Sequence, residues 1–180
     1  MTALLLALFL GHADAAELAG VPVADSASVG GQTLVLNGVG LREKYYFDIY
    51  VGALYLPGKT TSGASAIAQD VPKRIQMTFI YSAVTKAQLE ETYDEDLQYM
   101  PDPAAVKDRF ETLKSYLSDV VAGDVITYDY VPGTGTSVTV KGKNMGTIAG
   151  KDFMEALWTI YLGTHPPTAK LKSGMLGTNQ

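Results

Sequence analysis

The sequence predicts an α+β fold, in which a first group of strands is followed by two helices, a second group of strands and a final helical segment. Three observations carry this prediction. β-Branched and aromatic runs broken by glycines fill residues 32–56, apolar residues recur at helical intervals between 85 and 121, and short alternating runs return between 124 and 148. Strands and helices that are segregated along the chain are typical of the α+β class.

Composition limits the kind of molecule. The chain has 180 residues, of which 47% are apolar and 18% charged, as in a folded globular protein. We expect one domain, over residues 16–180, because this length buries one good core and is short for two. A net charge of -5 without a basic cluster argues against a nucleic-acid partner. The absence of cysteine excludes disulfides, thiolate metal sites and cysteine nucleophiles, and no other metal site is predicted.

Residues 1–15 are predicted to be a cleaved signal peptide. Ala3 to Leu10 is an apolar run too short to span a bilayer, and small residues at Ala13 and Ala15 precede a cut that would leave Ala16 as the new terminus. A basic segment before the apolar run is missing, since the first Lys or Arg is Arg42. The interpretation is an exported protein, periplasmic or secreted, without stable membrane insertion after cleavage.

The stretch from Leu34 to Leu56 organises the rest. Two extended runs, 32–42 and 44–56, flank a turn, and neither face of the second run is simply polar, so we expect that strand to be covered on both sides. Counting back by twos from Leu34 and Leu36 places Gly38, Gly40 and Arg42 on one face, provided that no bulge intervenes.

Arg42 is the candidate functional centre. An arginine at the edge of an apolar layer keeps its charge, so it must be paired, reach water, or be reserved for an anionic ligand. A structural ion pair with Glu43 or Asp48 is the alternative that needs no function.

The following elements should complete a sheet with a helical layer. We predict a short helix over 63–69, a strand over 73–81, and a helix capped by Thr85 with Leu89, Tyr93, Leu97 and Met100 on its apolar side. A second helix begins at Pro103 and is expected to continue through Leu117 and Val121 until Gly123. The two helices should lie side by side on the sheet. The acidic side of the first should face solvent, because it lacks the spacing of a calcium loop: Glu90, Glu91, Asp94, Glu95, Asp96.

A β-meander and two helices end the chain. Strands are expected at 126–130, 137–141 and 145–148, with glycine-containing turns between them. The Gly-x-Gly pairs at Gly38 and Gly133 lack the rest of a nucleotide-binding pattern, so they are interpreted as turn formers. Gly150 opens a helix that Gly163 ends, and a last short helix covers 169–176.

Several motifs in this order resemble one known family. They are Leu-Asn-Gly-Val-Gly-Leu-Arg at 36–42, Gly-Ala-Leu-Tyr-Leu at 52–56, Gly-Thr-Gly-Thr at 133–136, Gly-Lys-Asp-Phe at 150–153, Leu-Trp-Thr-Ile-Tyr-Leu-Gly at 157–163 and Leu-Lys-Ser-Gly-Met-Leu-Gly at 171–177. Together they resemble the bacterial, exported branch of the chalcone isomerase-like proteins. The resemblance implies an open-faced sandwich: a large antiparallel sheet with a helical layer on one side and a smaller sheet on the other.

The resemblance also implies where a site would lie. Plant members close a chalcone to a flavanone, and an arginine in this motif organises the developing anionic charge; Arg42 matches it. A threonine of the plant site falls on Tyr50. The helix after Tyr81 offers no clear match to the remaining polar residues of that site, nor does the helix after Gly150.

Other branches of the family resemble fatty-acid carriers and haem binders. The first hypothesis is therefore a non-catalytic binder of an amphipathic anion, a fatty acid or haem, anchored by Arg42. The cavity wall is expected to come from Tyr46, Tyr50, Phe153 and Trp158, with Tyr45 and Phe47 as further candidates. For haem, His165 is the one histidine after the leader, on a loop where exposure is the expected state, and tyrosine and methionine are the other possible axial ligands.

Two alternatives remain. In the first, the chain would be an intramolecular lyase, an isomerase of chalcone-like conjugated carbonyl compounds, with Arg42 and Tyr50 as catalytic residues. In the second, it would be a scaffold in which Arg42 only satisfies the core.

Overall fold

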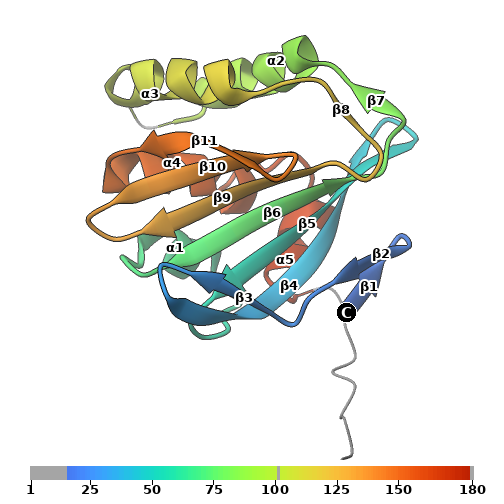
Figure 1. The fold of residues 1–180 in the computed structure, drawn as a ribbon, viewed down its shortest axis with the longest axis horizontal. Coiled ribbons are helices and arrows are strands. Elements are labelled where there is room, and N and C mark those ends of the chain that lie inside the picture. Colours follow the sequence, from blue (N-terminus) through green and yellow to red (C-terminus); the bar gives the residue numbers. More distant parts are fainter. Residues whose placement is uncertain (1–15, 101, 179–180) are drawn as a thin grey trace, which may run out of the picture.

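The computed structural model describes residues 16–100 and 102–178. The predicted signal peptide lies outside these residues. The core element is a curled antiparallel sheet with the order β11-β10-β9-β6-β5-β4-β3 (Figure 1). Its strands are β3 (Ser26–Val29), β4 (Gln32–Lys44), β5 (Phe47–Leu56), β6 (Lys73–Phe79), β9 (Val125–Val131), β10 (Gly135–Val140) and β11 (Lys143–Ile148).

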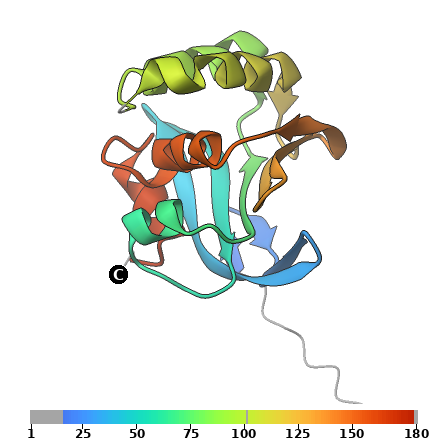
Figure 2. The same ribbon diagram turned by 90° about the vertical axis from the view of Figure 1, so that its left-hand side faces the viewer.

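Two short sheets flank the main one. One pairs β1 (Ala16–Leu18) with β2 (Val21–Val23), and the other pairs β7 (Ala83–Val84) with β8 (Val120–Val121). Figure 2 shows helices α1 (Gly63–Ala68), α4 (Lys151–Leu162) and α5 (Ala169–Met175) on one face of the main sheet. Helices α2 (Lys86–Leu97) and α3 (Pro103–Tyr116) form a pair along its upper side (Figure 1). The predicted α+β open-faced sandwich is confirmed.

Strand β5 divides the apolar interior into two cores. Tyr50, Leu54 and Leu56 belong to the large core between the sheet and the helices. Val51 and Tyr55 point the other way, into a smaller core that β2 closes. The strand is therefore covered on both faces, as the sequence predicted, because successive side chains of a strand alternate between its faces.

Strand β4 contains a β-bulge, whereas the prediction that Leu34, Leu36, Gly38, Gly40 and Arg42 share one face assumed a regular strand. The register with β5 shifts between Leu36 and Gly38, so Asn37 is the extra residue. Its amide donates to the carbonyl oxygens of Thr60 (3.0 Å) and Met175 (2.8 Å). Leu34 and Leu36 consequently pack into the smaller core and do not share a face with Gly38, Gly40 and Arg42, although the count by twos had grouped them. Beyond the bulge, Gly38 and Gly40 face the helices, and so does Arg42.

Two predicted boundaries were wrong. Helix α3 ends at Tyr116, because Leu117 turns to an extended conformation and the β-branched pair Val120–Val121 joins β7 as strand β8. The second predicted strand begins later than expected, since Tyr45 and Tyr46 form the two-residue turn between β4 and β5, where Tyr45 has a φ of 58°. The capping box at Thr85 and Gln88 is confirmed.

No helix in the described parts of the chain, 16–100 and 102–178, has the length and apolar character needed to cross a bilayer.

The contact between α5 and β4 is a backbone-to-backbone one. A Cβ atom at Gly38 would collide with the carbonyl oxygen of Gly174, and one at Gly40 with that of Leu171. Close approach of this kind is available only to glycine, so α5 is seated on the strand at these two positions.

We expect Gly40→Ala to lower the free energy of unfolding by about 2 kcal/mol, because helix α5 must move away from the sheet to make room. Gly58→Ala is the matched control, since nothing lies within 4 Å of the added methyl group there. Urea denaturation of both variants measures the difference. Equal midpoints for the two variants would contradict the seating of α5 on Gly40.

Candidate functional site

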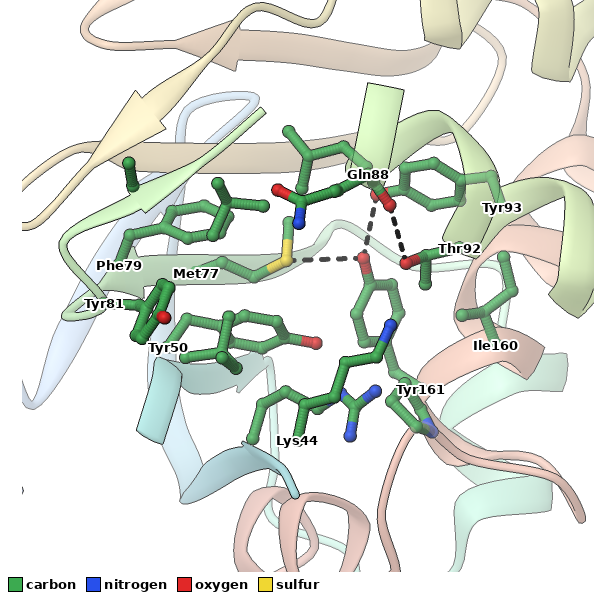
Figure 3. A pocket seen from close by; sticks show the side chains of 16 residues that line it. Lys44, Tyr50, Met77, Phe79, Tyr81, Gln88, Thr92, Tyr93, Ile160 and Tyr161 are labelled. Carbon is green, nitrogen blue, oxygen red and sulfur yellow. Dashed lines mark hydrogen bonds between the residues drawn. The ribbon is translucent and has the colours of Figure 1, made fainter. Parts of the chain in front are cut away.

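A cavity of about 110 Å³ lies between the main sheet and helices α2 and α4 (Figure 3). Strands β4, β5 and β6 form one wall, and the α2 and α4 side chains form the other. Most of its lining side chains are apolar or aromatic: Ile49, Tyr50, Met77, Phe79, Tyr81, Ala83, Val84, Leu89, Tyr93, Ile160, Tyr161 and Pro167. The remaining lining residues are polar or cationic: Arg42, Lys44, Gln88 and Thr92.

Arg42 lines this cavity without a carboxylate partner. One Nη atom donates to the backbone carbonyl of Glu43, the next residue. No Asp or Glu oxygen of residues 16–100 or 102–178 lies within 4.0 Å of its guanidinium. Glu43 pairs with Lys170 at 2.9 Å instead, and Asp48 is exposed in the hairpin. The predicted alternative of an ion pair with Glu43 or Asp48 is therefore not formed.

Tyr50 stands directly opposite Arg42 in the register of β4 and β5. Its side chain is buried and packs against Phe79, with 5.5 Å between the ring centroids. Burial raises the pKa of Tyr50 well above its usual value, although the charge of Arg42 opposes that rise. The hydroxyl therefore stays protonated at neutral pH. It has no hydrogen-bond partner within the described residues, so it is available as a donor to a ligand.

A cluster of buried tyrosine hydroxyls borders the cavity. Tyr93 of α2 contacts the hydroxyl of Tyr128 and, at 3.1 Å, that of Tyr161 of α4. Tyr161 also donates to the sulfur of Met77 at 3.4 Å, a contact drawn in Figure 3. Burial raises the pKa of all three phenols, so the cluster remains neutral.

An outer groove continues from the cavity. Arg42, Lys44, Thr92 and Pro167 line both, which places the guanidinium at the neck where cavity and groove meet. The groove is further lined by Glu95, Asp96, Tyr99, Thr164, His165, Pro166 and Ala169. A molecule with an apolar body and an anionic end could therefore contact apolar side chains inside the cavity and the positively charged Arg42 at its entrance.

The whole described domain matches a known family. The family model for chalcone isomerase-like proteins matches residues 15–177. The chain belongs to the chalcone isomerase-like family. The crystal structure of a fatty-acid binding protein from Arabidopsis thaliana is similar, with a TM-score of 0.70 at 16% sequence identity, over 87% of this chain and 92% of that one. At this identity the likeness concerns the fold. No curated protein matches the sequence.

Among the predicted site residues of this family member, the structure brings Arg42 and Tyr50 together and leaves three outside the cavity lining. Tyr46 is fully exposed at the hairpin turn. Phe153 is buried against Phe110, with 5.2 Å between the ring centroids. Trp158 is buried with the Lys73 ammonium 5.9 Å from its ring. Phe153 and Trp158 thus serve the large core, because the side of α4 that meets the cavity is the one carrying Ile160 and Tyr161.

Tyr45 and Phe47 also lie outside the cavity. Tyr45 is 86% exposed, while Phe47 is 54% exposed and packs edge-on against Tyr81. His165 is exposed as expected, stacks on Tyr99 with 4.4 Å between centroids, and lines the outer groove. No histidine of the described residues borders the inner cavity.

Sequence reasoning missed the contribution of α2. Leu89 and Tyr93 were predicted to form an apolar stripe, and in the structure this stripe lines the cavity on the side of α2. Gln88 and Thr92 of the same helix also line the cavity. The acidic side was predicted to face solvent, and this holds for most of its residues; Asp94 pairs with Lys114 at 2.7 Å. In the described residues, no group of three or more acidic or histidine side chains could hold a metal ion.

Asp96 and Glu90 are only partly exposed on that side, and of these two Asp96 lines the outer groove. Its side chain is half-buried in the groove, and burial raises the pKa of its carboxyl group to about 6, against the lowering effect of Arg42. The helical period groups Asp96 with the other carboxylates of α2. Asp96 differs from them because it lines the groove together with Arg42 of β4 and the loop after α4.

Asp96 makes stability depend on pH. The pKa in the folded protein, about 6, lies above the usual value of 3.8, so its favourable contribution is complete below about pH 4 and is lost as the pH rises through 6. Asp96→Asn should therefore gain about 1 kcal/mol relative to the natural chain at pH 7.5, after allowance for solvent screening, and little at pH 4. Urea denaturation at both pH values measures this, and a variant difference that is the same at both would contradict it.

Proposed function

We propose that this protein is a non-catalytic binder of an amphipathic carboxylate, such as a fatty acid, with Arg42 as the anchor of the acid group. The observation that carries the proposal is a guanidinium at the neck of an apolar cavity with no carboxylate within 4.0 Å in the described residues. A charge of this kind is costly unless something anionic meets it, and a carboxylate accepts two parallel hydrogen bonds from arginine.

Tyr50 supplies a second donor for the same acid group. It faces Arg42 across β4 and β5, it is protonated, and its hydroxyl has no partner among the described residues. Arginine and tyrosine together offer a carboxylate three hydrogen bonds at one end of a greasy cavity. The similar fold of the fatty-acid binding protein supports the same ligand class.

The cavity favours a slender ligand. At about 110 Å³ it is smaller than the roughly 300 Å³ at which sites for drug-sized ligands begin. A single acyl chain is narrow enough to enter between sheet and helices, whereas a haem macrocycle needs a broad slot. His165 stacks on Tyr99 in the outer groove, so it offers no axial ligand inside the cavity. The small volume of the cavity therefore favours a fatty acid over haem.

The absence of a proton acceptor favours binding over catalysis. No His, Asp or Glu of residues 16–100 and 102–178 lines the inner cavity, and burial raises the pKa values of three tyrosines that line it, Tyr50, Tyr93 and Tyr161. General base catalysis needs a group that is unprotonated near neutral pH within reach of the reacting proton. The isomerase alternative would have to rely on Arg42 and Tyr50 as hydrogen-bond donors to a substrate that is already ionised.

Removal of the guanidinium should weaken ligand binding. We expect Arg42→Ala to raise the dissociation constant for decanoate on the order of 10- to 100-fold, the loss expected for charge-assisted hydrogen bonds. Isothermal titration calorimetry at pH 7 measures the change, and mass spectrometry of an organic extract shows whether acyl chains copurify with the natural chain and not with the variant.

Lys107→Ala is the control for the loss of one positive charge, because Lys107 is exposed on α3 and has no partner among the described residues. Decanoate affinity that is the same in Arg42→Ala and Lys107→Ala would refute the anchor. Arg42-dependent turnover of a chalcone above the spontaneous rate would replace the binder with the isomerase.

We also propose that the protein is exported to the periplasm or secreted. The apolar run from Ala3 to Leu10 and the small residues before Ala16 support this proposal. Expression of the full chain in a bacterium should yield a mature protein that begins at Ala16 in the periplasmic or external fraction, which N-terminal sequencing checks. Retention of Met1 in the purified protein would contradict cleavage.

A further inference from the structure

Asp96, a residue that lines the outer groove, has a side-chain oxygen that the protein leaves unsatisfied. Oδ2 of Asp96 is buried and has no hydrogen-bond partner within residues 16–100 and 102–178. Asp96 lies in the last turn of α2 and lines the same groove as Arg42. Buried carboxylate oxygens are normally paired, because an unpaired one costs the full loss of its hydration.

Arg42 and Asp96 lie close enough to influence one another and too far apart to pair. The charge of Arg42 lowers the pKa of Asp96, yet no nitrogen of the guanidinium is within 4.0 Å of a carboxylate oxygen. Two groups of opposite charge that flank a groove without closing on each other leave room for a group between them. The ligand's acid group, held by Arg42 at the neck, would come to lie there.

The other charged groups do not satisfy Asp96. From β4, Arg42 and Lys44 face the groove; from α2, Glu95 does; and from the loop after α4, His165 does. Tyr99 completes this side and is engaged in stacking with His165. Two further carboxylates of α2 have lysine partners elsewhere, Glu90 with Lys86 at 3.6 Å and Asp94 with Lys114 at 2.7 Å, and Glu91 is exposed.

We propose that Asp96 is a second binding residue for the acid group, and that it acts as a carboxylic acid which donates a hydrogen bond to the carboxylate held by Arg42. This inference rests on the proposed function. A carboxylic acid and a carboxylate form a short O–H···O⁻ hydrogen bond, which is about twice as strong as a neutral one. The ligand carboxylate becomes the hydrogen-bond partner that the protein does not supply to Asp96. Protonation of Asp96 also removes the repulsion between two negative groups.

Binding should therefore take up a proton. The pKa of Asp96 is about 6 in the free protein, so the group is mostly protonated at pH 5 and mostly ionised at pH 7. Above that pH each ligand must bring a proton with it, so affinity should fall by up to about tenfold for each further unit of pH. The ligand would be held in mildly acidic surroundings and released in alkaline ones.

The test compares decanoate with decane-1-sulfonate, which stays ionised throughout, by calorimetry on the full mature chain between pH 5.5 and 8.5. For the natural protein we expect both probes to bind more weakly at pH 8.5 than at pH 5.5, by at least about tenfold, with proton uptake visible as a dependence of the heat on the buffer. Asp96→Asn should bind both probes with nearly the same affinity at every pH, because its amide donates a hydrogen bond and carries no charge.

Two matched variants isolate the effect. Glu95→Gln removes the neighbouring, exposed carboxylate of the same groove, and His165→Gln removes the histidine, a residue type that also changes charge between pH 5 and 8. Both should keep the pH dependence of the natural chain. Asp96→Ala should lose it as well, but with weaker binding at pH 5.5 than Asp96→Asn, since alanine donates nothing.

The results separate the two proposals. Binding that depends on Arg42 but not on pH, or a pH dependence that survives in Asp96→Asn, overturns the role of Asp96 and leaves the proposed function standing. Loss of the pH dependence in His165→Gln instead assigns it to His165 and also overturns the inference. Absence of binding of either probe at every pH overturns the proposed function, and this inference with it.

Discussion

The bulge at Asn37 is the constraint on which the arrangement of the site depends. Side chains of a strand alternate strictly, so one extra residue moves all later side chains to the opposite face. Without it, Gly38 and Gly40 would face the small core and α5 would meet side chains in place of bare backbone. Arg42 would point away from the cavity. The amide of Asn37 fixes the bulge by donating to the carbonyl oxygens of Thr60, which precedes α1, and of Met175, the last residue of α5.

The position of Arg42 also explains why it remains without a carboxylate partner. Its nearest acidic neighbour in sequence, Glu43, follows a second shift of register and pairs with Lys170 at 2.9 Å. A long, always charged side chain at the neck of a cavity can lie along apolar walls with its stem while its head meets water or a ligand. The fold thus keeps the Arg42 guanidinium without a carboxylate partner among the described residues, at a place where β4, α2 and the loop after α4 converge, while Glu43 pairs with Lys170.

Much of the fold could be predicted from the sequence, because periodicity records burial directly. The alternation in β5, the cap at Thr85 and the helix that Gly150 opens are local signals, and each was found in the structure. The end of α3 was missed since Leu117 and Val121 continue the helical period although they serve as the cap and as strand β8. Periodicity cannot distinguish a helical residue from a cap or strand residue when an apolar side chain suits either position.

The site was only partly predictable for a related reason. Arg42 and Tyr50 follow from one strand pair, so sequence spacing and family likeness place them together. Phe153 and Trp158 are aromatic and buried, but whether a buried aromatic residue borders a cavity or fills a core depends on which elements cross above it. Tyr93, Tyr161 and Asp96 come from helices far from β4 in the chain, and no local pattern relates them to Arg42.

The distribution of titratable groups divides the site into two functional parts. Inside the cavity, the phenols of Tyr50, Tyr93 and Tyr161 have raised pKa values and stay neutral, so these hydroxyls can exchange hydrogen bonds with a ligand without exchanging charge. The charged groups, Arg42, Lys44 and Asp96, line the neck and the groove. Any proton that a ligand gains or loses must therefore move at its acid group and not along its apolar body. In a fold of this kind, substitutions in α2 and α4 can change which apolar ligand body is accepted, while residues of β4 continue to bind the acid group.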